Sequence, residues 1–143
     1  MKATNKYNAT IYGHIPSKSN CYKIGVLNGH GTLVKQKKLK EYENTFVGQC
    51  VGRRSPSNPL IKGFFHLWVD VYLPNKTQDL DNCLKILLDL LQTCGIIKND
   101  CKCLHIDATR YEDKKNPRVT FEIEEVFGGD EPEADASGTV ALA

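Results

Sequence analysis

The stretch Phe64-Phe-His-Leu-Trp-Val-Asp-Val-Tyr-Leu73 carries the clearest secondary-structure pattern in this sequence. Its apolar side chains sit at alternate positions and are Phe65, Leu67, Val69 and Val71. The opposite face carries His66, Trp68, Asp70 and Tyr72. A period of two predicts a strand that buries one face, and Pro74 is expected to end it because proline cannot join a central hydrogen-bond ladder.

A helical pattern follows this strand after a short polar loop. On a wheel of about 3.6 residues per turn, the side chains of residues 81–93 divide into one narrow polar sector and a wide apolar one. The polar sector comprises Asp81, Asn82, Lys85, Asp89, Gln92 and Thr93. The apolar sector comprises Cys83, Leu84, Ile86, Leu87, Leu88, Leu90 and Leu91. The pattern predicts a largely buried helix with one solvent-facing stripe, which Gly95 is suited to end.

The remaining elements flank this strand and helix on both sides. Upstream, the sequence predicts a strand at Tyr7–Gly13, a hairpin formed by Tyr22–Leu27 and Thr32–Val34, and a helix at Lys37–Val51. Downstream, it predicts a hairpin formed by Leu104–Tyr111 and Arg118–Val126. This order favours a single α+β domain with a largely antiparallel or mixed sheet and two main helices.

The length and composition are those of one globular domain with a core. The chain has 143 residues, of which 41% are hydrophobic. No apolar run approaches the roughly twenty residues that span a bilayer, so no membrane segment is expected. The polar start, Met1 to Thr10, has no apolar core of a secretory signal, and a cytoplasmic location is the expectation.

Charge is distributed unevenly along the chain, although the net value is only +2. Residues 128–143 contain four acidic residues and no lysine or arginine, so subtracting four from 17 leaves 13 acidic against 19 basic residues elsewhere. We predict a folded domain at 1–127 and a disordered acidic tail at 128–143, since the tail has little apolar surface to bury. A basic body of this kind attracts polyanions.

Carboxylates mark the entrance and the far side of the second predicted helix. Asp79 and Asp81 are separated by one residue at the helix start, and Asp100 follows the helix in a turn that can fold back towards its polar stripe. Such a set suits Mg²⁺ or Mn²⁺, which generate hydroxide and neutralise developing charge in phosphodiester hydrolysis. Lys85 is placed to contact the phosphate.

An ordinary structural explanation accounts for the same residues. Aspartate at a helix start is a common N-cap, and Asp81 with Lys85 makes a common ion pair between residues four apart. The spacing alone favours this explanation, because three acidic residues within a short segment are frequent in soluble proteins.

A resemblance to a known family changes the balance. The run Asp79-Leu-Asp-Asn-Cys-Leu-Lys85, followed by Leu87-Leu-Asp-Leu-Leu91 and Gly95-Ile-Ile-Lys-Asn-Asp100, resembles the hallmark segment of RusA-like Holliday junction resolvases. The resemblance places the family's metal-binding aspartates on Asp79, Asp81 and Asp100 and its catalytic lysine on Lys85. Shorter segments are similar too, namely Ile15-Pro-Ser-Lys-Ser-Asn20, Tyr72-Leu-Pro74 and Val119-Thr-Phe-Glu-Ile123.

The resemblance implies an activity and its partners. It implies a homodimer, encoded by a bacterium or phage, that binds four-way DNA junctions and makes paired nicks with Mg²⁺ or Mn²⁺ in recombination and repair. Basic side chains agree with a DNA partner, although each one alone is ordinary solvated surface. The candidates for DNA contact are Lys37, Lys38, Lys76, Lys102 and Arg110.

Two other functions stay open at this point. Cys94, Cys101, Cys103 and His105 have the residue types of a zinc site, which would make the protein a zinc-stabilised interaction module. Their spacing lacks the paired C-x₂₋₄-C pattern of structural zinc, and reduced, partly buried thiols are the expectation for all six cysteines. A non-catalytic DNA-binding protein would use the same basic body.

Overall fold

The structure, a computed structural model, describes residues 5–16, 22–27, 30–35 and 37–126. The predicted tail at 128–143 lies outside these residues, as does much of the segment that follows Pro16. The elements are β1 (Lys6–Tyr12), β2 (Tyr22–Leu27), β3 (His30–Lys35), α1 (Lys37–Gln49), β4 (Phe65–Leu73), α2 (Leu80–Thr93), the 3₁₀ turn η2 (Asp100–Lys102), β5 (Cys103–Glu112) and β6 (Arg118–Glu125).

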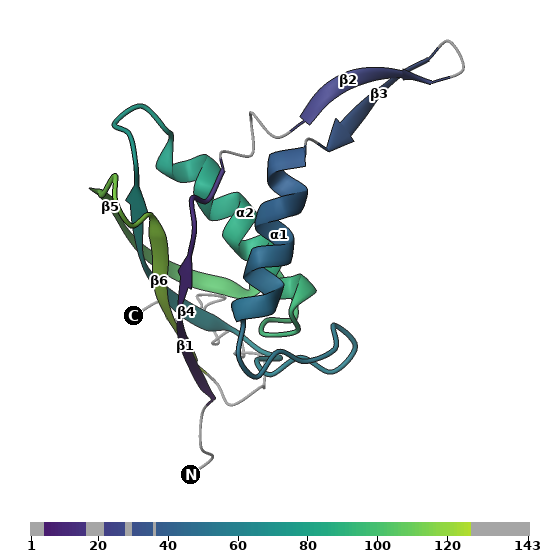
Figure 1. Cartoon of the computed structure of the whole chain (residues 1–143). Coiled ribbons are helices and arrows are strands. Elements are labelled where there is room, and N and C mark those ends of the chain that lie inside the picture. The colour runs from purple at the N-terminus through teal and green to yellow at the C-terminus, as the bar shows by residue number, and fades with distance from the viewer. Residues whose placement is uncertain (1–4, 17–21, 28–29, 36, 127–143) are drawn as a thin grey trace, which may run out of the picture.

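Four strands form one mixed sheet in the order β1-β6-β4-β5. β6 is antiparallel to both of its neighbours, whereas β5 runs parallel to β4 because α2 connects them as a crossover. Strands β2 and β3 form a separate antiparallel hairpin that projects from the body beside the start of α1 (Figure 1). The predicted α+β class, with a mixed sheet and two helices in one domain, is confirmed.

The core lies between one face of the sheet and the two helices (Figure 1). Every second residue of β4 is buried, as the alternation predicted. From α1 the core receives Leu39, Tyr42 and Phe46, and from α2 it receives Cys83, Ile86, Leu87, Leu90 and Leu91. Each fully buried side chain of this size contributes about 1.5–3 kcal/mol through the hydrophobic effect.

The predicted hairpin between the last two strands is wrong. Both strands form where expected, but β4 lies between β5 and β6 in the sheet. The connection at 113–117 therefore passes the end of β4, where the Asp113 amide donates to the Leu73 carbonyl at 2.8 Å. This order gives the most apolar strand a ladder partner on both edges and leaves the mostly exposed β5 at the edge of the sheet.

Gly95 ends α2, as its position predicted. Its φ of +67° lies in the left-handed region, and the amide of Ile96 donates back to the Leu91 carbonyl at 2.9 Å. A Cβ at Gly95 would collide with the Arg54 carbonyl oxygen, so glycine is required both by the turn and by the close approach of the 51–58 loop. Neither helix within the described ranges has the length and apolar character needed to cross a bilayer.

Candidate active site

The entrance of α2 is organised by the side chain of Asp79. This residue is the N-cap, with an extended backbone, and its Oδ1 accepts a hydrogen bond from the Asp81 amide at 3.3 Å. Its Oδ2 accepts from Asn82 Nδ2 at 3.4 Å. Both carboxylate oxygens thus face the first turn of the helix, where the helix dipole favours negative charge.

Asp81 and Lys85 lie together on the exposed stripe of α2. Lys85 Nζ is 3.5 Å from Asp81 Oδ2, and the two side chains are 56% and 72% exposed. Ion pairs this open to solvent contribute about 0.3–0.5 kcal/mol on a helix, so the pairing is weak enough for either group to change partners. The ion pair therefore gives both residues an ordinary structural role on the helix surface. Their charges nevertheless remain accessible to a ligand.

The loop before Asp79 is held by an asparagine turn. Asn75 Oδ1 accepts from the Gln78 amide at 2.9 Å, from the Thr77 amide at 3.1 Å and from the Thr77 hydroxyl at 3.3 Å. Arg110 of β5 anchors the same residue from outside, because its Nη2 donates to the Asn75 carbonyl at 2.9 Å. These bonds fix the path of the chain from the end of β4 to Asp79 and Asp81, which we call the acid pair.

Gln78 ties this loop to the segment after β1. Its Nε2 donates to the Ile15 carbonyl at 2.6 Å and to Cys83 Sγ at 3.1 Å. Because the amide nitrogen is used in this way, Oε1 faces His14 and accepts from its Nε2 at 2.5 Å. The sequence alone did not identify Gln78 and His14 as partners, because they are 64 positions apart and no local pattern links them. The Asn75-Lys-Thr77 segment, in contrast, has a composition typical of a turn.

Asp100 lies at the opposite end of α2 from the acid pair. It opens η2, which Asn99 caps, and its amide donates to Gln92 Oε1 at 3.2 Å. Gln92 lies eleven positions after Asp81 on the helix, which is about 16 Å along the axis. The three carboxylates do not meet within one chain, and no group of three or more metal-binding side chains occurs among the described residues.

The predicted DNA-contacting residues fall in different places. Lys37 and Lys38 are exposed at the start of α1, and Lys37 pairs with Glu41 at 3.7 Å. Lys76 lies in the loop that leads to the acid pair, is 85% exposed and is only loosely paired with Glu112 at 4.0 Å. Lys102 lies over the Phe64 ring, and Arg110 serves the Asn75 loop, so both have structural contacts.

The cysteines do not gather as a zinc site among the described residues. Cys94 is buried and hydrogen bonded to Cys50, the residue after α1, and this contact raises the pKa of the Cys94 thiol. Cys101 is exposed, while the Cys103 thiol donates to the His105 carbonyl and burial raises its pKa. The thiols of Cys94 and Cys103 are therefore engaged in separate local contacts.

A family model described as Endodeoxyribonuclease RusA matches residues 16–124, which span β2 to β6 and include the acid pair, Lys85 and Asp100. No curated protein matches the chain. Since the match covers well over half of the sequence and the whole α2 region, the chain belongs to the RusA endodeoxyribonuclease family.

Proposed function

We propose that this protein is a metal-dependent endonuclease that resolves four-way DNA junctions by paired nicks. Its setting would be recombination and repair in the cytoplasm of a bacterium or of a phage-infected cell. The observation that carries the proposal is an exposed pair of carboxylates, Asp79 and Asp81, held on a braced helix entrance beside Lys85 in a chain of this family.

The acid pair fits a hard divalent cation. Carboxylate oxygens are the ligands that Mg²⁺ and Mn²⁺ prefer, and Mg²⁺ retains water molecules that require open space around the site. Asp81 is mostly exposed, and the groups that contact the two aspartates lie at 3.3–3.5 Å, beyond the usual hydrogen-bond distance. When bound, the metal would supply hydroxide and neutralise charge on the leaving oxygen. Asp79 and Asp81 would hold it, and Lys85 would turn to the scissile phosphate.

A two-fold dimer explains how Asp100 would join the pair. If the exposed stripes of two α2 helices pack antiparallel, the start of each helix lies beside the end of the other. Asp81 would then stand opposite the partner's Gln92, whose side chain is the acceptor for the Asp100 amide in its own chain. Each of the two sites would take its acid pair from one chain and its third aspartate from the other.

The stripe of α2 has the composition for such a contact. Leu84 and Leu88 are only partly buried and lie beside Asp81 and Lys85 on the wheel. An antiparallel arrangement that sets Asp81 against the partner's Gln92 also sets Lys85 against the partner's Leu88. Partly exposed leucines between polar residues are typical of a modest, self-complementary interface.

The start of α1 supports a DNA partner. Three lysines, Lys37, Lys38 and Lys40, are exposed at the positive end of the helix dipole, where basic residues lower helix stability. The three lysines thus add positive charge at a helix end that is already positive, which concentrates positive electrostatic potential there. Phosphate groups are the complement of that potential.

The direct test is cleavage of a synthetic four-way junction. Wild-type protein with Mg²⁺ is expected to nick two strands at symmetric positions, whereas Asp81→Asn should bind the junction and leave it intact. Binding and cleavage are measured on the same junction by gel shift and by denaturing gel. Equal nicking by both proteins would refute the acid-pair mechanism, and binding without nicking by the wild type under Mg²⁺ and Mn²⁺ would indicate a non-catalytic DNA-binding protein.

A further inference from the structure

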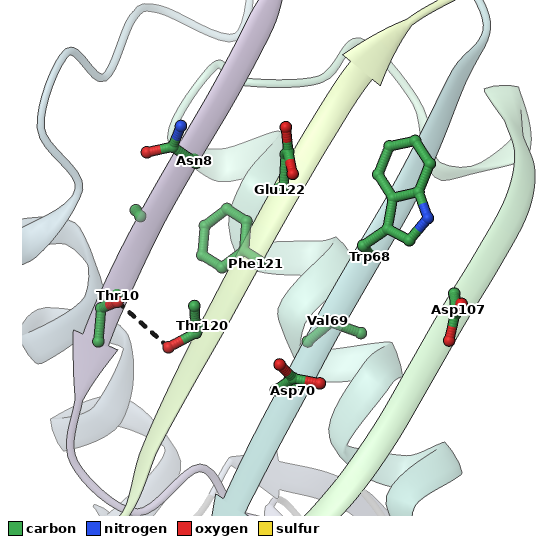
Figure 2. Close-up of a pocket in the computed structure, with 10 residues that line it drawn as sticks. Asn8, Thr10, Trp68, Val69, Asp70, Asp107, Thr120, Phe121 and Glu122 are labelled. Atoms are coloured by element: carbon green, nitrogen blue, oxygen red, sulfur yellow. Dashed lines mark hydrogen bonds between the residues drawn. The ribbon is translucent and has the colours of Figure 1, made fainter.

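The face of the four-stranded sheet turned away from α1 and α2 carries a hollow of about 530 Å³. We call this side the outer face. In the close-up, Asn8 and Thr10 of β1, Thr120 and Glu122 of β6, Trp68 and Asp70 of β4, and Asp107 of β5 line it, while Phe121 and Val69 belong to the layer beneath (Figure 2). No element within the described ranges covers the hollow, because both helices pack on the opposite side (Figure 1).

Trp68 lies on β4, and each of the two neighbouring strands carries a carboxylate beside it. The strand register sets it directly opposite Asp107 on β5 and opposite Glu122 on β6. Asp70, two residues along β4, points to the same side. An aromatic face flanked by carboxylates is the chemistry that receives a guanidinium or ammonium group, through cation–π and charge-assisted hydrogen bonds.

The three carboxylates have no cationic partner in the part of the chain that the structure describes. The ion pairs of the outer face lie at its margins, where Lys6 pairs with Glu124 and Arg118 pairs with Asp113. Asp70, Asp107 and Glu122 form no hydrogen bond or ion pair with a described residue. Their uncompensated charge repels phosphate, so this face is unsuited to DNA.

We propose that the outer face docks a basic protein segment, with an arginine or lysine side chain held between Trp68 and the carboxylates Asp70, Asp107 and Glu122. The occupant is a different protein rather than a second copy, because two outer faces packed together would set these negative charges against each other. The face also lies on the other side of the sheet from α2, so docking there leaves the candidate active site and its dimer contact open.

Trp68 is the only tryptophan of the chain, so its fluorescence reports on this hollow directly. The experiment titrates full-length protein with a short peptide of alternating arginine and glycine and follows tryptophan emission. We expect a saturable change in the wild type and binding weakened by about tenfold or more in Asp70→Asn/Asp107→Asn/Glu122→Gln, since three charges facing the ligand are removed. A matched variant, Asp130→Asn/Glu131→Gln/Glu133→Gln, removes three charges from the acidic tail and should change the affinity by no more than about twofold.

The remaining outcomes overturn the proposal. An unchanged emission, or an equal loss of affinity in the tail variant, would mean that the peptide is not held in the hollow. A response to junction DNA at the same concentrations would make the face a DNA surface, and a changed sedimentation coefficient of the outer-face variant would make it a contact between copies. Junction cleavage by the outer-face variant should equal that of the wild type, which separates failure of this proposal from failure of the nuclease assignment.

Discussion

At the scale of single residues, Asp79 combines two roles that are usually offered as alternatives. Its carboxylate caps α2 through the Asp81 amide, and the same oxygens are candidate metal ligands. The structural explanation and the functional one are therefore not exclusive, because an N-cap carboxylate is held in place by the helix before any metal arrives. Substitutions at this position can separate the two roles.

Asp79→Asn is expected to abolish junction nicking while keeping the unfolding free energy within about 0.5 kcal/mol, because asparagine caps helices as well as aspartate does. Asp79→Ala should lose nicking and about 1 kcal/mol of stability as well. Chemical denaturation and the junction assay measure the two effects on the same preparations. A stable Asn variant that still nicks would remove Asp79 from the metal site.

At the scale of elements, the sequence predicted what is local and missed what is not. The bounds of β4 and α2 follow from periods of two and 3.6 within one segment. The neighbours of β5 and β6 depend on which strand takes the centre of the sheet, and that choice rests on burial across the whole chain. The same holds for the candidate site. The acid pair could be predicted from one short segment, whereas the hydrogen bond between Gln78 and His14 joins segments that are distant in the sequence.

Two glycines at helix ends should respond to alanine in opposite directions. Gly48 lies in the last turn of α1 with open space around it, so Gly48→Ala should raise stability by about 0.5–1 kcal/mol. Gly95→Ala should lower it by more than about 2 kcal/mol, because the turn needs a positive φ and the Arg54 carbonyl leaves no room. Thermal unfolding distinguishes them, and a neutral Gly95→Ala would contradict the described turn.

The lysines at the start of α1 should govern DNA affinity rather than stability. Lys37→Ala/Lys38→Ala is expected to weaken junction binding and to lower the slope of log affinity against log salt by about 2, one for each lost phosphate contact. Lys6→Ala, which removes a lysine paired with Glu124 at the margin of the outer face, is the control and should leave that slope unchanged. Equal slopes in all three proteins would place the DNA elsewhere.

At the scale of the whole molecule, the placement of Asp79 and Asp81 at one end of α2 and of Asp100 beyond the other end predicts a site shared between two chains. If each site takes Asp100 from the partner, a mixture of Asp81→Asn and Asp100→Asn proteins should regain activity that neither has alone. An equal mixture would hold about a quarter of the wild-type number of intact sites, all in mixed dimers with one working site. The products should be single nicks rather than pairs.

The mixture must be allowed to exchange subunits before the assay, for example by mild unfolding and refolding of the two proteins together. A site built within one chain would leave both members of every mixed dimer inactive. Persistent inactivity after exchange, with mixed dimers detected by mass spectrometry of differently tagged chains, would therefore refute the shared site.

The position of β6 between β1 and β4 has a consequence for how the protein is made. Of the four described strands of this sheet, β1 leaves the ribosome first, yet its ladder partner β6 is the last of the four to be synthesised. When synthesis has passed Asp79 and Asp81 but not yet reached β6, both β1 and β4 still lack the strand that pairs with each of them in the finished sheet. Completion of the sheet, and with it any nuclease competence, waits until translation has passed Glu125.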